Sequence, residues 1–160
     1  MKFGITGHTS GIGKSLFNYF DAIGFSRSNG YNVNFPENII NNLENCNIFI
    51  NNAHGGFGQS KMMKAIFDKW KDEKDKHIIN IGVTKVNVKT WELVHETYSV
   101  EKLAAHAMCD QCQSLKRECR ITNLCLGVVE NYKGLITYEQ IIETILYIVK
   151  NKYEIKEVVL

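Results

Sequence analysis

Gly7, Gly11 and Gly13 form a glycine-rich turn near the start of the chain, between an apolar segment at 3–6 and a helical pattern at 15–20. A buried strand that turns directly into a helix aims free backbone N–H groups, and the positive end of the helix dipole, at one point. An anionic group is stabilised at that point. Glycine suits the turn because a Cβ atom would prevent close approach of a phosphate and of the neighbouring strand. The turn predicts nucleotide binding, although a tight connection without a ligand has the same pattern.

Tyr98 and Lys102 form a second group with possible chemistry, because they are four residues apart in a helical pattern. At this spacing two side chains lie one turn apart on the same helix face. A tyrosine ordinarily has a pKa near 10, and a fixed ammonium group nearby favours the phenolate and lowers that pKa. Such a tyrosine can donate a proton to a carbonyl oxygen or accept one from an alcohol. A solvated pair on a helix surface has the same spacing.

The elements that would position these groups alternate along the chain. Apolar runs predict strands, here given in chain order: 3–6, 24–28, 31–33, 46–50, 77–83, 121–128 and 155–160. Helical patterns are predicted at 15–20, after Pro36, and at 61–74, 99–118 and 137–150, where Thr137 and Gln140 have the form of a capping box. The usual helix between the second and third strands is missing. The pattern predicts an α/β fold, a doubly wound parallel sheet with a shortened second βα unit.

Length and composition indicate one compact domain over residues 1–160. The chain is 44% hydrophobic and 22% charged, with a single proline and no low-complexity tract. Its net charge of +2 is too small to favour binding to nucleic acid or to an anionic membrane. No apolar run is long enough to span a membrane, and no signal peptide is evident, so we expect a cytoplasmic protein. The odd number of cysteines, five, favours reduced thiols.

The order of these pieces resembles the short-chain dehydrogenase/reductase family over the whole chain. The motifs that carry the resemblance are, in order, Thr6-Gly7-x-x-x-Gly11-Ile12-Gly13, Asn51-Asn52-Ala53, Tyr98-x-x-x-Lys102 and the strand Arg120–Leu126 running into Gly127. Any one of these motifs arises by chance, but four in the right order between the right elements are a strong signal. The resemblance implies a Rossmann-like fold and hydride transfer between a nicotinamide cofactor and a carbonyl or alcohol.

The resemblance also implies roles for individual residues. Tyr98 would be the proton donor or acceptor, and Lys102 would activate it and bond the nicotinamide ribose, while Thr84 is the nearest candidate for the carbonyl-binding hydroxyl. The cofactor-binding residues would be Gly7, Thr9, Ser10, Gly11, Ile12, Gly13, Ser26, Arg27, Asn32, Val33, Asn51, Asn52, Ala53, Lys102, Gly127 and Val129.

Residues at the end of the second predicted strand favour NADP(H) over NAD(H). An NAD-preferring site would place an acidic residue there to bond the ribose hydroxyls. This chain has Ser26 and Arg27, with no carboxylate before Glu37. A guanidinium and a hydroxyl bind a 2′-phosphate well, whereas a carboxylate would repel it. The alternative is that Arg27 is simply solvated at the end of a strand.

The chain departs from the family pattern at three places. Gly82 and Val83 occupy the position of the carbonyl-binding serine, so that Thr84 would serve only if the strand end shifts. The family's asparagine on the preceding long helix has no clear counterpart, and Gln59 is a weak candidate. Between Asn131 and Thr137 only five residues remain where the family has a substrate-covering loop. These departures leave a nucleotide-binding protein with little or no catalysis as the alternative function.

Other residue groups have plainer interpretations. Cys109 and Cys112 lie near His106 at helical spacing but lack a fourth metal ligand, so we expect packing residues and no metal. His8 and His54 flank the predicted cofactor site, where a polar contact or a solvated side chain is favoured over an acid or base. The apolar stripe of helix 61–74 predicts core or a subunit contact. By analogy with the family we expect a homo-oligomer, a dimer or a tetramer.

Overall fold

The computed structural model describes residues 1–84, 97–129 and 136–160. Residues 85–96 and 130–135 lie outside this description. Most of the short connection before Thr137 belongs to the second of these segments. None of the described helices has the length and apolar character that a membrane span requires.

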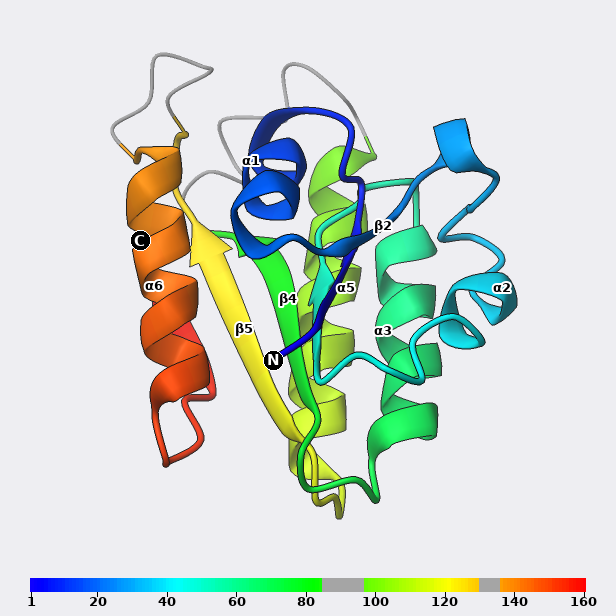
Figure 1. The fold of residues 1–160 in the computed structure, drawn as a ribbon, viewed down its shortest axis with the longest axis vertical. Helices are drawn as coiled ribbons and strands as arrows, with labels where there is room; N and C mark the ends of the chain where they lie inside the picture. The colour runs from blue at the N-terminus through cyan, green and yellow to red at the C-terminus, as the bar shows by residue number, and fades with distance from the viewer. Residues whose placement is uncertain (85–96, 130–135) are drawn as a thin grey trace.

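Six parallel strands form one sheet in the order β2-β1-β3-β4-β5-β6 (Figure 1). The strands are β1 (Phe3–Thr6), β2 (Ile23–Phe25), β3 (Ile48–Asn51), β4 (His77–Val83), β5 (Arg120–Leu126) and β6 (Glu157–Val159). The chain therefore moves outward from β1 to β2, returns past β1 to β3, and then proceeds in one direction. The doubly wound α/β fold predicted from the alternation of elements is confirmed.

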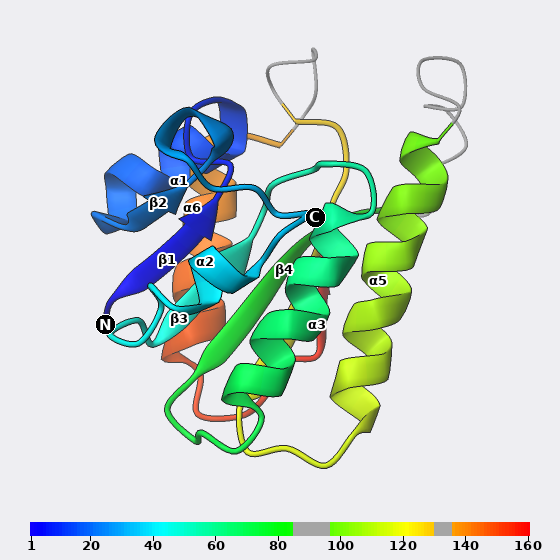
Figure 2. The same cartoon turned by 90° about the vertical axis from the view of Figure 1, so that its right-hand side faces the viewer.

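Helices cover both faces of the sheet. They are α1 (Gly11–Phe20), α2 (Glu37–Ile40), α3 (Gly58–Trp70), α5 (Tyr98–Ser114) and α6 (Tyr138–Lys150). Figure 2 shows α3 and α5 side by side on one face, with α1 and α6 on the other. The capping box predicted at the start of α6 is present, because Thr137 Oγ1 accepts a hydrogen bond from the Gln140 N–H.

Alternating side chains of the strands enter two separate cores. In β3, Phe49 faces α3 and α5, whereas its neighbours Ile48 and Ile50 face α1 and α6. The apolar stripe of α3, Met62, Met63, Phe67 and Trp70, is buried in the first of these cores. A strand buried on both faces needs apolar residues at successive positions, which is why the parallel strands read as continuous apolar runs.

The predicted strand at 31–33 is wrong. Its backbone bonds locally, since the Tyr31 N–H donates to the Ser26 carbonyl and the Phe35 N–H to that of Asn32. Val33 nevertheless reaches the core, which explains the apolar pattern without a strand. As a result β2 forms the edge of the sheet.

Element boundaries differ by a few residues at the glycine-rich ends. α1 begins at Gly11 and α3 at Gly58, in each case before the apolar pattern that predicted the helix. Glycine is a poor helix former, so the first turns of both helices were not evident from propensity. The bounds predicted for β4, residues 77–83, agree with the structure.

Candidate functional site: a cleft at the carboxyl ends of the strands

The glycine-rich turn after β1 has a backbone that only glycine adopts readily. Gly7 and Gly11 have positive φ angles of 73° and 51°. A Cβ atom on Gly13 would lie 2.0 Å from the carbonyl oxygen of Gly7. The requirement for glycine at these positions therefore comes from both the conformation of the turn and the close approach of α1 to it.

The amino terminus of α1 has the character of an anion site. The first N–H groups of a helix have no partner within it. Here the side chain of Ser10 at the N-cap makes no capping hydrogen bond, and the first turn of α1 contains no acidic residue. The positive end of the helix dipole thus meets neither a capping side chain nor a carboxylate within its own first turn.

Thr6 fixes the turn after β3 beside the glycine-rich turn. Its Oγ1 accepts hydrogen bonds from the backbone N–H groups of Asn52 and Ala53, both at 3.0 Å. In return Asn52 Nδ2 donates to the Thr6 carbonyl at 3.0 Å. Two turns that are far apart in the sequence become one rigid wall. The predicted residue Asn51 lies behind this wall, fully buried, and does not line the cleft.

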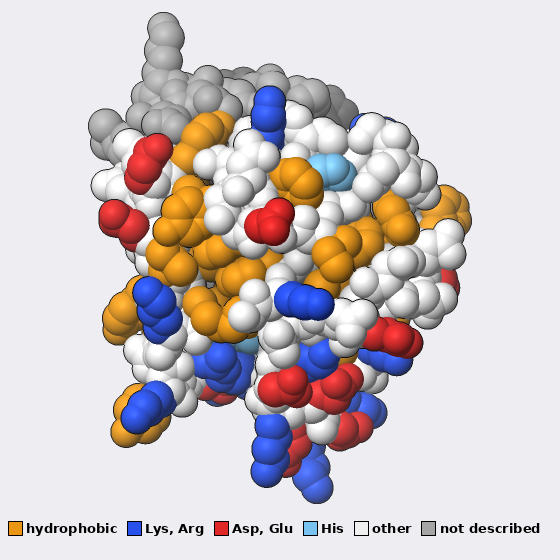
Figure 3. Space-filling model, viewed as in Figure 1, with side chains coloured by type: hydrophobic (Ala, Val, Ile, Leu, Met, Phe, Trp, Pro, Cys, Tyr) orange, Lys and Arg blue, Asp and Glu red, His pale blue; other side chains and the backbone are white. Residues whose placement is uncertain are grey.

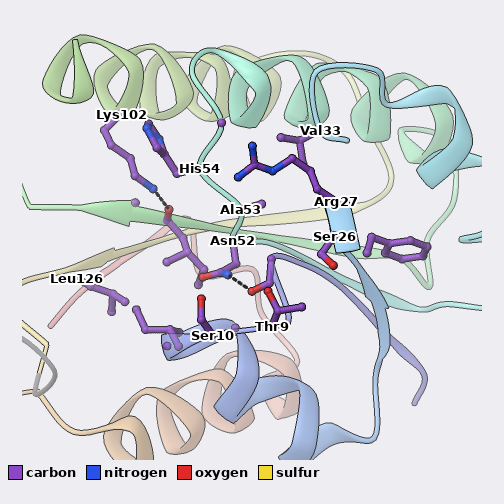
Figure 4. A pocket seen from close by; sticks show the side chains of 18 of the residues that line it. Thr9, Ser10, Ser26, Arg27, Val33, Asn52, Ala53, His54, Lys102 and Leu126 are labelled. Carbon is purple, nitrogen blue, oxygen red and sulfur yellow. Dashed lines mark hydrogen bonds between the residues drawn. The ribbon is translucent and has the colours of Figure 1, made fainter. Parts of the chain in front are cut away.

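A cleft of about 990 Å³ opens between these turns, above the point where the chain diverges from β1 to β2 and β3. Such a switch point is where open α/β sheets bind ligands. In Figure 4, Lys102 and His54 lie at one end of the cleft and Ser26 and Arg27 at the other. Apart from Asn51 and Thr84, every site residue predicted from the sequence lines it.

The turn after β2 carries a cluster of hydroxyl groups beside Arg27. Ser26 and Ser28 line the cleft, and their Oγ atoms are 2.7 Å apart. Asn29 holds this turn in place, because its Oδ1 accepts from the Ser26 N–H and its Nδ2 donates to the Gly24 carbonyl, both at 2.8 Å. Ser28 was not predicted as a site residue. Its place in a short turn next to Arg27 was the available signal.

Tyr98 and Lys102 both line the opposite end of the cleft. The Lys102 Nζ atom lies 5.9 Å from the centroid of the Tyr98 ring. Lys102 is buried, and its Nζ donates to Gln59 Oε1 at 2.8 Å and to the Ile81 carbonyl at 3.4 Å. Burial lowers the pKa of this lysine to about 8. The structure brings together the phenol and the amine that the spacing predicted to share a helix face.

Gln59 holds Lys102 in position. Its Nε2 donates to the carbonyl oxygens of Asn51, at 2.9 Å, and Ile81, at 2.8 Å. Because both acceptors are backbone carbonyls, the Oε1 atom must point towards Lys102. The sequence indicates Gln59 only as a weak counterpart of the family asparagine, since the contacts of this side chain depend on two strands that are distant in the chain.

His54 lines the cleft, whereas His8 does not. Its Nε2 atom lies 2.9 Å from Glu101 Oε2, and its ring centroid is 4.8 Å from that of Tyr98. The polar contact expected for His54 is therefore made with a carboxylate on α5. His8 packs instead against Phe17, with ring centroids 4.8 Å apart, and is not among the residues that line the cleft.

Thr84 does not line the cleft. It follows the last residue of β4, and its backbone N–H donates to the Leu126 carbonyl at 3.0 Å. Gly82 and Val83 line the cleft at this point. Gly82 has no side chain and that of Val83 is apolar, so neither residue offers a side-chain hydrogen-bond donor for a carbonyl oxygen.

Solved structures with the same architecture include short-chain dehydrogenases/reductases. No protein-family model and no curated protein matches the sequence. Serine dehydrogenase from Escherichia coli has a TM-score of 0.74 at 15% identity, with 100% of this chain and 97% of that chain covered. A short-chain dehydrogenase/reductase from Vibrio parahaemolyticus has a TM-score of 0.70 at 11% identity, covering 99% and 98%.

An alcohol dehydrogenase from the archaeon Thermococcus sibiricus, complexed with 5-hydroxy-NADP, has a TM-score of 0.70 at 17% identity, with 100% of this chain and 96% of that chain covered. Several other similar structures are complexes with NADP or NADPH. The similarity extends over the whole chain, including the strands and helices that carry the cleft. The chain therefore has the fold of the short-chain dehydrogenases/reductases.

Proposed function

We propose that this chain is an NADP-dependent oxidoreductase that interconverts a carbonyl compound and an alcohol. The observation that carries the proposal is a single cleft with a glycine-rich anion site in its wall and Tyr98 and Lys102 at one end. Bound NADPH would supply a hydride to the substrate carbon. The protein would supply position, charge and a proton.

The cleft fits a dinucleotide with a phosphorylated ribose. The space beside Gly7 and Gly13, which a Cβ atom would fill, lies next to the amino terminus of α1, where a pyrophosphate is stabilised. Arg27, Ser26 and Ser28 at one end of the cleft suit a 2′-phosphate. Complexes of similar structures with NADP support the same choice.

Tyr98 is the proposed proton donor and acceptor. During reduction its phenolic proton passes to the carbonyl oxygen, and the phenolate that forms is stabilised by the Lys102 ammonium. During alcohol oxidation the proton moves in the opposite direction. Gln59 keeps the ammonium in place through the 2.8 Å hydrogen bond to its Oε1.

The second candidate function is a nucleotide-binding protein with little catalysis. It is favoured by Gly82 and Val83, which line the cleft at the position of the carbonyl-binding serine, while Thr84 does not line it. Loss of one such hydrogen-bond donor typically lowers a rate by about a hundredfold to a thousandfold. Residual activity is thus expected to be slow unless another group binds the carbonyl oxygen.

Turnover of NADPH with a broad panel of carbonyl compounds separates the two functions. We expect wild-type protein to oxidise NADPH with at least one compound and Tyr98→Phe to lose that activity while keeping its affinity for NADPH, measured by fluorescence titration. Leu115→Ala, at an exposed position far from the cleft, is the control. Binding of NADPH without turnover in either protein would favour the second candidate.

We further propose that the chain forms a homo-oligomer and that it is located in the cytosol. The first proposal is supported by Val100 and Leu103, exposed apolar residues on α5, which favour contact between copies across the face formed by α3 and α5. All five cysteines are buried and none forms a disulfide, as suits a reducing compartment. Size-exclusion chromatography with light scattering tests the first proposal, since Leu103→Glu should then release monomers.

A further inference from the structure

A row of buried asparagines crosses the sheet behind the cleft. Asn51 pairs with Asn80 and Asn80 with Asn123 in the registers of β3, β4 and β5, and Asn123 pairs with Glu157 of β6. The three asparagines are fully buried. Asn80 Nδ2 donates to Asn123 Oδ1 at 2.9 Å, so that a hydrogen bond between amide side chains connects β4 to β5 inside the protein. We call Gln59, Asn80 and Asn123 the amide ladder.

The direction of every hydrogen bond in the amide ladder follows from backbone carbonyls at Gln59. The nitrogen of this side chain is fixed by the Asn51 and Ile81 carbonyls, and it also donates to Asn80 Oδ1 at 3.2 Å. Asn51 Nδ2, itself bonded to the Gln59 carbonyl, donates to the same oxygen at 3.1 Å. Asn80 therefore presents its nitrogen to Asn123, and all the amides point the same way.

His106 on α5 is the far end of this chain of donors. Asn123 Nδ2 donates to His106 Nδ1 at 2.8 Å. Since that nitrogen must accept, the ring proton of neutral His106 lies on Nε2, which faces Asp110 at 3.4 Å and Glu157 at 3.5 Å. Cys125 Sγ lies 3.7 Å from Nδ1. Histidine, amides and lysine thus form one path from the cleft to the partly exposed carboxylates beside β6.

The ligand atoms of His106, Cys125 and Glu157 lie within 4.8 Å of one another, a spacing that a metal ion would also fit. Both ring nitrogens of His106 already face groups of the protein, Nδ1 the side chains of Asn123 and Cys125, and Nε2 the carboxylates of Asp110 and Glu157. These contacts favour an internal hydrogen-bond path.

We propose that the amide ladder couples the charge of Lys102 to the protonation of His106, which makes Asn80, Asn123 and His106 positioning residues for the lysine. A second proton on His106 would convert Nδ1 into a donor facing the donor Nδ2 of Asn123. Turning the amides over to relieve this contact would remove Gln59 Nε2 from two carbonyls and aim it at the Lys102 ammonium. Whether the two donors stay face to face or the amides turn over, the free energy rises when His106 and Lys102 are both charged.

Groups on three elements face the His106 ring. Asp110 on the same helix and Glu157 on β6 face Nε2, whereas Asn123 and the buried Cys125 on β5 face Nδ1. Coupling between two sites is reciprocal. Discharge of Lys102 should therefore make His106 easier to protonate. An effect of this coupling on turnover, through the charge of Lys102, rests on the proposed function. The coupling itself does not depend on that function.

Nuclear magnetic resonance of the whole, cofactor-free protein tests the coupling without any activity measurement. Nitrogen-15 shifts of the imidazoles, assigned with His106→Gln and followed over pH, should show that the neutral form of His106 has an unprotonated Nδ1. The carbon-13 ε signal of Lys102, assigned with Lys102→Met, should show a second inflection at the pH where the His106 ring titrates. A neutral ring protonated on Nδ1, or no second inflection, would overturn the proposal.

Three variants complete the test. His106→Gln keeps an acceptor for Asn123 but does not titrate, so the second inflection of Lys102 should vanish. Asn123→Leu should let His106 take up its second proton about threefold to tenfold more readily, the effect of one lost hydrogen bond. Gln113→Leu removes two hydrogen bonds from α5, to the Ile121 and Lys156 carbonyls, that lie outside the amide ladder, and it should change neither signal. An unchanged Lys102 titration in His106→Gln would contradict the coupling even if Asn123→Leu failed to fold.

Discussion

Arg27 is the side chain on which the preference between the two nicotinamide cofactors depends most. We expect Arg27→Asp to weaken NADPH at least tenfold more than NADH, because it replaces a guanidinium beside Ser26 and Ser28 with a carboxylate that repels a 2′-phosphate. Fluorescence titration with both cofactors measures the ratio. Equal losses for the two cofactors would remove Arg27 from the site.

Lys102 should make the stability of the protein depend on pH above neutrality. Burial lowers its pKa from 10.5 to about 8, so the folded protein binds fewer protons than the unfolded chain between these values. The free energy of unfolding should therefore rise from pH 8 to 10.5, by up to about 3 kcal/mol from this group. Urea unfolding of wild type and Lys102→Met at pH 7.5 and 10 measures the difference. The slope should be smaller in the variant, and equal slopes would contradict the burial of a charged amine.

His77 should act in the opposite pH range. Burial, together with the nearby Arg120, lowers its pKa from 6.5 to about 3. Its Nε2 bonds Thr122 Oγ1 at 2.9 Å, whereas Nδ1 has no partner among the described residues. The neutral ring thus contributes stability that is present above pH 6.5 and is lost as the pH falls towards 3, on the order of 4 kcal/mol. His77→Gln should flatten this acid slope in urea unfolding, and an undiminished slope would assign it to other groups.

The sequence predicts a site residue best where its role depends only on neighbours within the same turn or helix. The glycines and the Tyr98–Lys102 pair act within one turn or one helix, so their spacing in the sequence carries the signal. Gln59 and the asparagines behind it act through the register of separate strands, which no spacing reveals. Thr84 was chosen as the nearest hydroxyl in the sequence, but the end of β4 does not turn it into the cleft.

At the scale of elements, the contact between α1 and the turn after β1 should control cofactor binding. The Cβ of Gly13→Ala would lie 2.0 Å from the Gly7 carbonyl oxygen, so turn and helix must move apart. We expect NADPH affinity to fall at least tenfold. Gly30→Asn is the matched control, because asparagine tolerates a positive φ and an added Cβ at this position has no atom within 4 Å. Its NADPH affinity should change little. Wild-type affinity in Gly13→Ala would mean that this turn does not hold the cofactor.

Elements were predicted best where burial is continuous. β1 and β4 agree with their predicted bounds, because a parallel strand buried on both faces is apolar throughout. The segment 31–33 has the same apolar character for another reason, since Val33 packs into the core from a loop. Periodicity over three residues cannot separate these two cases.

On the scale of the whole molecule, the cleft lies at the opposite end of the sheet from the densest group of charged side chains in Figure 3. The cleft opens at the carboxyl ends of the strands, whereas Figure 3 shows lysines and acidic residues gathered at the other end, below a band of apolar side chains. The alternation of strands and helices predicted a doubly wound sheet. The order of its strands, β2-β1-β3-β4-β5-β6, comes from the structure, because periodicity does not specify which strands are neighbours.

A crystal structure with NADP⁺ would decide whether the cleft binds the cofactor as proposed. We expect the pyrophosphate against the amino terminus of α1, the 2′-phosphate within hydrogen-bond distance of Arg27, and the nicotinamide ring beside Tyr98. A cleft that stays closed to NADP⁺ at millimolar concentration, or a cofactor bound with its nicotinamide away from Tyr98, would contradict the proposal.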